Sequence, residues 1–206
     1  MEKEAAGMYL SGNPLDEFSY LKKLLRTVSI YEIISGQGSR FRDGDPVRIL
    51  CILQDKKTHV TKKGDNMCFL TLEDNGSEID AIAFPDLFSV AASRLNPGNV
   101  LLISGKISLK DETASVICES IFSDGEFGRF TEGRKLCVKL DSKSVSDALE
   151  QLQGLASLYR GETAVCFYLT DMKKTVLPKT KLSVQISAQS TEKLAELFSY
   201  DKIGLI

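Results

Sequence analysis

The residues best suited to chemistry lie between positions 56 and 63, where four lysines surround the only histidine of the chain. They are Lys56, Lys57, His59, Lys62 and Lys63. Lysine ammonium groups attract phosphates. An aromatic residue, Phe69, follows in a stretch that alternates like a strand. Cations beside an exposed ring are typical of surfaces that bind single-stranded nucleic acid, because the cations follow the backbone while the ring stacks on a base.

The stretch from Met67 to Glu73 decides which side chains share a face. Strand alternation separates two sets: Phe69, Thr71 and Glu73 from Cys68, Leu70 and Leu72. The leucine side is the better candidate for the core, which would leave Phe69 on the outside. The alternative interpretation is that Phe69 fills space in a barrel or between domains, and that the lysines form a solvated hairpin tip.

Charge limits how strongly this surface could bind. The whole chain has a formal net charge of −2, and residues 45–124 contain eight Lys and Arg against twelve Asp and Glu. Arg48, Lys106 and Lys110 lie on adjacent predicted strands and could extend the basic patch, although single surface cations are common. Binding to phosphates would therefore depend on a local patch and would be weak and sensitive to salt.

The elements around this run predict a small barrel. In chain order they are strands at 46–54, 67–73 and 78–84, a helix that starts at Pro85 and stops before Asn96, and strands at 100–109 and 114–121. Lys56 to Lys63 is expected to be the loop between the first two strands, and Asn75-Gly76 predicts a tight hairpin after the second. Three strands, a helix and two strands are the element order of the OB-fold, a five-stranded barrel.

The flanking regions predict a helical lead-in and a second domain. Residues 1–38 fit two short helices, around Tyr9-Leu10 and from Pro14 through Leu25, and the barrel domain would span 39–124. Residues 122–129 resemble a linker. Residues 130–206 then show strand, helix, strand, strand, helix, strand, with helices capped by Ser144 and by Ser190 or Thr191. This order predicts a small two-layer, ferredoxin-like α+β domain.

Enzymatic chemistry has little support in the residues. The five cysteines are widely spaced and lack a Cys-x-x-Cys pair, so we do not expect a zinc site. We expect the cysteines to be reduced, as in a reducing compartment. We find no phosphate-binding loop and no nucleophile elbow. The acidic residues Glu73, Asp74, Glu78 and Asp80 could hold a metal for hydrolysis, but a polar hairpin end explains them more simply. We expect no active site and no cofactor.

No apolar run is long enough to span a membrane, and the first residues are charged rather than signal-like, so a cytoplasmic location is expected.

Several short segments, in order along nearly the whole chain, resemble the C-terminal region of the bacterial replicative DNA polymerase III alpha subunit. They are Glu2-Lys3-Glu4, Gly7, Tyr9-Leu10-Ser11-Gly12, Pro14-Leu15-Asp16, Thr61-Lys62-Lys63-Gly64, Phe69-Leu70-Thr71-Leu72-Glu73-Asp74 and Ala83-Phe84-Pro85. The resemblance implies an OB domain that handles single-stranded template DNA, followed by a small domain that in some members contacts the clamp-loader subunit tau. Lys62, Lys63 and Phe69 fall on the family's hairpin and second OB strand.

The polymerase domains of that family, with their catalytic carboxylates, have no counterpart in this sequence. The resemblance therefore implies a part of a polymerase that does not catalyse nucleotidyl transfer by itself. Two functions stay open, a module that binds single-stranded DNA weakly through the OB face, and a replisome module that contacts the clamp loader or the rest of the polymerase. A metal-dependent nuclease is a third and weaker alternative.

Overall fold

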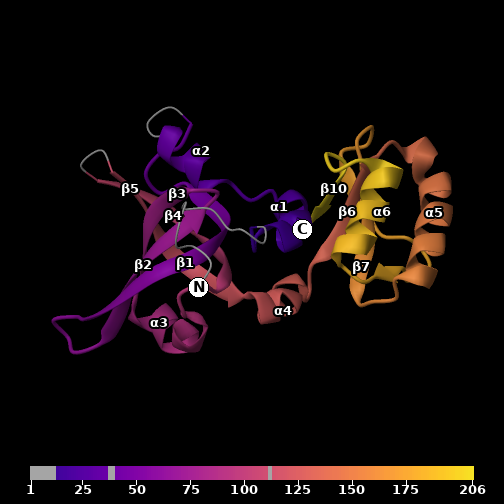
Figure 1. The fold of residues 1–206 in the computed structure, drawn as a ribbon. Helices are drawn as coiled ribbons and strands as arrows, with labels where there is room; N and C mark the ends of the chain where they lie inside the picture. The colour runs from indigo at the N-terminus through magenta and orange to yellow at the C-terminus, as the bar shows by residue number, and fades with distance from the viewer. Residues whose placement is uncertain (1–12, 37–39, 111–112) are drawn as a thin grey trace. The chain divides into compact units, whose positions relative to one another are not determined.

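The computed structural model describes residues 13–36, 40–110 and 113–206, which pack into two compact units. The first contains residues 13–16 and Thr27–Phe127, and the second contains Glu17–Arg26 and Gly128–Ile206. Each unit has its own sheet (Figure 1). A lead-in over 1–38 and domains over 39–124 and 130–206 stay proposals, because compactness alone does not show that either piece folds by itself.

The first unit is built on a closed barrel of five strands. They are β1 (Pro46–Val60), β2 (Asn66–Asp74), β3 (Ser77–Ala83), β4 (Val100–Lys110) and β5 (Thr113–Ser123). Their order around the barrel is β1-β2-β3-β5-β4, with β3 and β5 parallel and the other neighbours antiparallel. The helix α3 (Pro85–Ala91) and the 3-10 turn η2 (Ala92–Arg94) connect β3 to β4. The predicted OB-fold is confirmed.

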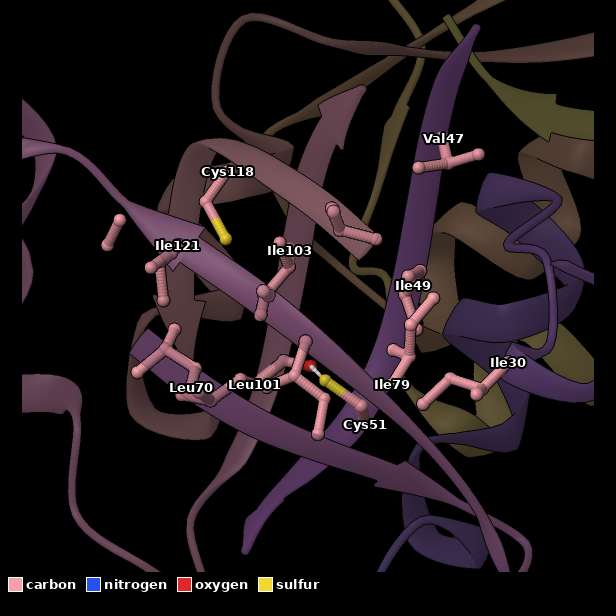
Figure 2. Packing of buried hydrophobic residues seen from close by; sticks show 14 of the residues in the cluster. Ile30, Val47, Ile49, Cys51, Leu70, Ile79, Leu101, Ile103, Cys118 and Ile121 are labelled. Atoms are coloured by element: carbon pink, nitrogen blue, oxygen red, sulfur yellow. Dashed lines mark hydrogen bonds between the residues drawn. The ribbon is translucent and has the colours of Figure 1, made fainter. Parts of the chain in front are cut away.

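The barrel interior is lined by the inward side chains of all five strands, as Figure 2 shows. Cys51, Leu70, Ile103 and Cys118 are among them. The helix α2 (Ile30–Ser35), which the sequence pattern did not predict, adds two isoleucines to this core. Six residues are too few to show a helical period.

The signal for α2 was its cap. The Ser29 hydroxyl accepts from the N–H of Glu32 at 3.1 Å, and the Glu32 carboxylate accepts from the N–H of Ser29 at 3.0 Å. This reciprocal arrangement is a capping box, which satisfies two backbone donors at the start of a helix.

The prediction of a loop over Lys56 to Lys63 was wrong. β1 continues to Val60 and pairs with β2 up to Asn66, so the connection is the short turn at residues 61–65. Lysine and threonine side chains can stand on a two-stranded ribbon with their polar ends in water, and polarity alone therefore did not mark the end of the strand. Figure 1 shows this ribbon extending away from the barrel.

The predicted hairpin between β2 and β3 is confirmed at Asn75-Gly76. Both residues have positive φ, at 51° and 82°, as the tight hairpin turn requires.

The second unit is an α+β structure, as predicted. Its elements after the barrel are α4 (Phe127–Thr131, whose first residue belongs to the first unit), β6 (Lys135–Leu140), α5 (Val145–Leu158), β7 (Thr163–Leu169), β8 (Lys174–Val176), β9 (Ser183–Val184), α6 (Ala188–Phe198) and β10 (Ile203–Leu205). The strand order is β10-β6-β7-β8, with β9 also paired to β7. The helix α1 (Ser19–Leu25) packs against β10 in this unit.

The ferredoxin-like detail needs a correction. A split βαβ unit places another strand between the two that flank the first helix, but β6 and β7 are direct parallel neighbours here. β8 returns from β7 through a short hairpin and therefore pairs on the free side of β7, leaving β6 in place on the other side.

Three further details differ from the sequence predictions. The expected linker at 122–129 contains the end of β5, the 3-10 turn η3 (Asp124–Glu126) and the start of α4, because a second capping box joins Ser123 to Glu126. Asp141 rather than Ser144 accepts the first free N–H groups before α5. Ser187 rather than Ser190 or Thr191 caps α6.

The helix expected from Pro14 is shorter than predicted, because the turn η1 (Asp16–Phe18) precedes α1. The helix expected around Tyr9-Leu10 lies outside the described residues.

Candidate nucleic-acid interface

A bulge in β1 decides which lysines reach the outer face of the barrel. Leu53 pairs with Leu72 and Asp55 pairs with Thr71, so Gln54 is an extra residue without a partner of its own in the ladder. An extra residue reverses the in-and-out alternation of a strand. Odd-numbered residues of β1 point inward before the bulge, whereas Asp55, Lys57 and His59 lie on the outer side after it.

One row of side chains crosses the outer face in register. From β1 through β2, β3 and β5 to β4 the paired residues are Lys57, Phe69, Ile82, Ile117 and Lys106. We call these five residues the aromatic row. Phe69 is the second residue of the row and 43% of it is exposed, while Ile82 and Ile117 are half-buried. Phe69 therefore has Lys57 beside it on β1 and the half-buried Ile82 beside it on β3.

A histidine contacts the Phe69 ring. His59 meets Phe69 edge to face, with ring centroids 6.3 Å apart. Edge-to-face contact is a favourable arrangement of aromatic rings. The contact leaves the exposed part of Phe69 available for another planar group.

A groove lies beside the aromatic row. A depression of about 210 Å³ is lined on the outer face by Asp55, Lys57, Phe69, Thr71 and Asp80. A second depression, of about 360 Å³, shares two of these residues, Thr71 and Asp80, as part of its wall. Its other residues are Ile34, Glu78, Ile79, Thr113 and Ala114. We call the two depressions together the outer-face groove.

The tip of the β1–β2 ribbon presents two lysines. The N–H of Thr61 donates to the carbonyl of Asp65 at 2.8 Å, and the N–H of Gly64 donates to the carbonyl of Thr61 at 2.9 Å. Gly64 has a φ of 89°, a conformation that favours glycine. Lys62 and Lys63 are exposed at this turn.

Most of the remaining predicted residues have partners elsewhere in the barrel, although Lys56 also lines the smaller depression. Lys56 lies opposite Leu70, a core residue, and its ammonium donates to the carbonyl of Leu95 near the end of η2. Arg48 is half-buried on β1 and donates to the Ser104 hydroxyl at 3.4 Å. Lys106 remains in the aromatic row but is 2.7 Å from the carboxylate of Glu119.

Lys110, the last of the predicted cations, also lies in the barrel. Lys110 is exposed at the end of β4.

The hairpin carboxylates divide into structural and exposed groups. Glu73 and Asp74 are buried; Glu73 accepts from the side-chain amide of Gln54 at 2.6 Å and from the N–H of Gly76 at 2.9 Å. Glu78 and Asp80 are exposed in the outer-face groove. Within the described part of the chain, no three His, Cys, Asp or Glu residues are arranged to hold a metal ion.

The sequence pattern alone did not place Asp55 and Asp80 beside Phe69. The alternation of β2 already placed Thr71 beside Phe69. Adding the residues opposite Thr71 on the neighbouring strands required the register of both hairpins. The Asn75-Gly76 turn fixes the register of β3 against β2 and so places Asp80 opposite Thr71. The register of β1 could not be predicted for Asp55, because the bulge at Gln54 shifts it by one residue.

With this geometry established, comparison with known proteins identifies the relatives of the chain. Residues 47–123 match the family model described as "OB-fold nucleic acid binding domain". The DNA polymerase III subunit alpha of Bacillus subtilis is 27% identical over 99% of this chain. The chain is similar to the DNA polymerase III alpha subunit. The corresponding subunit of Aquifex aeolicus is 25% identical over 82% of the chain.

The alpha-subunit relatives are much longer than this chain. It spans 18% of the length of the B. subtilis protein and 14% of the A. aeolicus protein. The similarity is thus to a small part of an alpha subunit, which includes the OB-fold region.

Solved structures resemble the chain over about two fifths of its length. The protein PriB of Ralstonia solanacearum aligns with a TM-score of 0.35 and 17% identity, covering 39% of this chain and 97% of PriB. A small single-stranded DNA-binding protein of Streptomyces coelicolor aligns with a TM-score of 0.34 and 13% identity, covering 40% of this chain and 96% of that protein.

No helix among the described residues is long and apolar enough to cross a membrane.

Proposed function

We propose that this chain acts as the part of a bacterial replicative polymerase alpha subunit that holds single-stranded template DNA on its OB barrel. It has no catalytic role of its own, needs no cofactor and works in the cytoplasm. The observation that carries this proposal is the position of Phe69, exposed on the barrel face directly opposite Lys57. The similarity to alpha subunits over nearly the whole chain supports the setting in DNA replication.

The energetics of such a surface favour weak contact. A base stacked on one aromatic side chain contributes about 1–3 kcal/mol. Lys57, Lys62 and Lys63 are the exposed cations nearest to Phe69 along the ribbon. Neutralising about three phosphates of a single strand predicts that affinity falls with roughly the second power of salt concentration.

An oligonucleotide titration tests this proposal. Fluorescence anisotropy of a labelled thymidine 15-mer should show binding at 25 mM salt, with affinity falling about 15- to 20-fold between 50 and 200 mM salt. Phe69→Ala and the double variant Lys62→Glu/Lys63→Glu should each weaken binding at least about fivefold. Lys179→Glu/Lys181→Glu is the matched control, because it makes the same charge change at exposed lysines of the second unit.

The proposal fails if the unmodified chain shows no binding at 25 mM salt. It also fails if the Lys62/Lys63 variant and its control lose affinity equally, since the loss would then come from net charge rather than from the ribbon. A Phe69→Ala variant with unchanged affinity would also overturn the proposal, because the exposed Phe69 ring is the observation that carries it.

A second candidate function is supported by the carboxylates of the outer-face groove. Asp55, Glu78 and Asp80 would repel a phosphate backbone placed directly over them, and the barrel region is acidic as a whole. A replisome subunit, such as the clamp-loader subunit tau or another part of the polymerase, would then be the partner, and DNA binding would be minor. Size-exclusion chromatography of the full chain mixed with the purified clamp loader tests this alternative. If the two proteins elute separately, the alternative is contradicted.

A further inference from the structure

The charges on the barrel face are distributed unevenly around Phe69. The exposed cations Lys57, Lys62 and Lys63 belong to the β1–β2 ribbon on one side of β2. On the other side, β3 presents the carboxylate of Asp80 to the groove. A strand bound as proposed above would therefore place its phosphates over the ribbon and turn the edge of a stacked base toward β3.

Asp80 has the geometry to meet that edge. It is directly opposite Thr71, the next outward residue of β2 after Phe69, and it lines the same depression as the Phe69 ring. Neighbouring strands are about 4.8 Å apart, so a ring lying on Phe69 and over Thr71 extends to the β3 side. Within the described ranges, no side chain or backbone group bonds the Asp80 carboxylate.

The other carboxylate of this depression is arranged differently. Asp55 lies on β1 and accepts from the N–H of Lys56 at 2.8 Å, and its neighbour on the same face is Lys57. It is therefore partly occupied and lies on the cationic side. Glu78, the remaining acid of the outer-face groove, lines only the second depression, which does not include Phe69.

A carboxylate distinguishes the bases by their hydrogen-bond donors. It only accepts hydrogen bonds. Guanine presents two donors side by side, the ring N1–H and the 2-amino group, which match the two oxygens of one carboxylate. Cytosine and adenine present one amino group beside a ring nitrogen that repels the carboxylate. Thymine presents one N–H between two carbonyl oxygens. Charge-assisted paired hydrogen bonds are the stronger and more specific kind.

We propose that Asp80 gives the groove a preference for guanine, so that the base stacked on Phe69 is read by the Asp80 carboxylate. The preference is a refinement of the proposed single-stranded DNA binding and depends on it. It also accounts for an acidic residue beside a surface that would bind DNA, which phosphate contacts alone would not explain. The ligand class is single-stranded DNA that contains unpaired guanine.

Competition between oligonucleotides tests the preference. The probes are a thymidine 15-mer, an alternating thymidine–guanosine 15-mer, and the same alternating sequence with inosine in place of guanosine. Inosine lacks only the 2-amino group, so it preserves the purine ring and its stacking. We expect the guanosine probe to bind about tenfold more tightly than the thymidine probe, and inosine to lose most of that advantage.

The variants separate base reading from stacking. Asp80→Asn and Asp80→Thr should bring the three probes to within about twofold of one another, while binding to the thymidine probe persists or strengthens because a negative charge is removed. Asp86→Asn is the matched control, an exposed acid at the start of α3, and should preserve the preference. Thermal unfolding shows that each variant is folded.

Each outcome has one meaning. Equal affinity of the unmodified chain for guanosine and inosine probes overturns the role of Asp80, because purine stacking would then explain any gain over thymidine. A guanosine preference that survives both Asp80 variants overturns it too. If no probe binds at low salt, the proposed single-stranded DNA binding itself fails, and the preference fails with it.

Discussion

Gln54 donates from its side-chain amide to the Glu73 carboxylate at 2.6 Å, joining the extra residue of the β1 bulge to the buried end of β2. The second oxygen of Glu73 accepts from the N–H of Gly76 in the β2–β3 turn. One carboxylate therefore ties the bulge to the next hairpin. Because the bulge determines which residues of β1 lie outward, this contact also supports the position of Lys57 beside Phe69.

Removing the Gln54 amide should destabilise the barrel. Gln54→Ala leaves the buried Glu73 carboxylate with one fewer donor, which typically costs about 1–3 kcal/mol of unfolding free energy. Urea unfolding monitored by circular dichroism measures the change. Gln153→Ala, at an exposed position of α5, is the control and should change stability little. Equal unfolding curves for Gln54→Ala and the unmodified chain would contradict the structural role of the bulge contact.

Lys56 and Lys57 should respond to substitution in opposite ways, although they are adjacent in sequence. Lys56→Met removes the ammonium that bonds the Leu95 carbonyl, and should lower the unfolding free energy by about 1 kcal/mol with little effect on oligonucleotide affinity. Lys57→Met should keep stability, weaken binding and make the salt slope shallower by about 0.7. Urea unfolding and anisotropy titrations measure both properties, and each variant is the control for the other. The same loss of affinity in both variants would contradict the assignment of faces.

Much of the barrel was predictable from local patterns. The alternation from Cys68 to Leu72, the Asn75-Gly76 turn and the proline at the first turn of α3 each describe an element whose physics is local. Phe69 could be placed outside for the same reason, because its two neighbours in β2 are core residues. These signals do not depend on how distant parts of the chain pack.

The bulge and the cross-barrel register could not be predicted in that way. Around Gln54 the chain changes from apolar to polar residues. The sequence pattern there cannot show that the inward and outward sides of the strand are exchanged. The parallel pairing of Ile82 with Ile117 depends on how β3 and β5 meet after a helix and another strand intervene. Whether β6 and β7 are neighbours could not be predicted either. The same order of helices and strands fits a sheet with another strand between them and a sheet in which they pair directly.

Gly105 should be intolerant of any side chain. It lies next to a register shift between β4 and β5, where an added Cβ would collide with the backbone carbonyl of Ile117. Gly105→Ala should therefore lower the unfolding free energy by about 1–3 kcal/mol, because the colliding atom is backbone and cannot rotate away. Gly125→Ala is the control, as space around that glycine is open. Equal midpoints of thermal unfolding for the two variants would show that the strands can separate without loss.

Acid should weaken the ion pair between Arg94 and Glu126, which joins η2 to η3 in the first unit. The hydrogen bond from the Arg94 side chain holds the pKa of Glu126 below its usual value of 4.5. A folded-state pKa below the unfolded value stabilises the fold above that value, and the contribution disappears as pH falls through the folded pKa. Glu126→Gln should thus be about 0.5–1 kcal/mol less stable at pH 7.

That difference should shrink as the pH is lowered below 4.5, where the unmodified chain loses the ionised carboxylate that the variant already lacks. Chemical unfolding at several pH values between 7 and 3 measures it. Glu132→Gln, at an exposed position outside the pair, is the control and should follow the unmodified chain at every pH. A stability difference that stays constant down to pH 3 would show that the Gln side chain harms packing, and that ionisation of Glu126 contributes nothing.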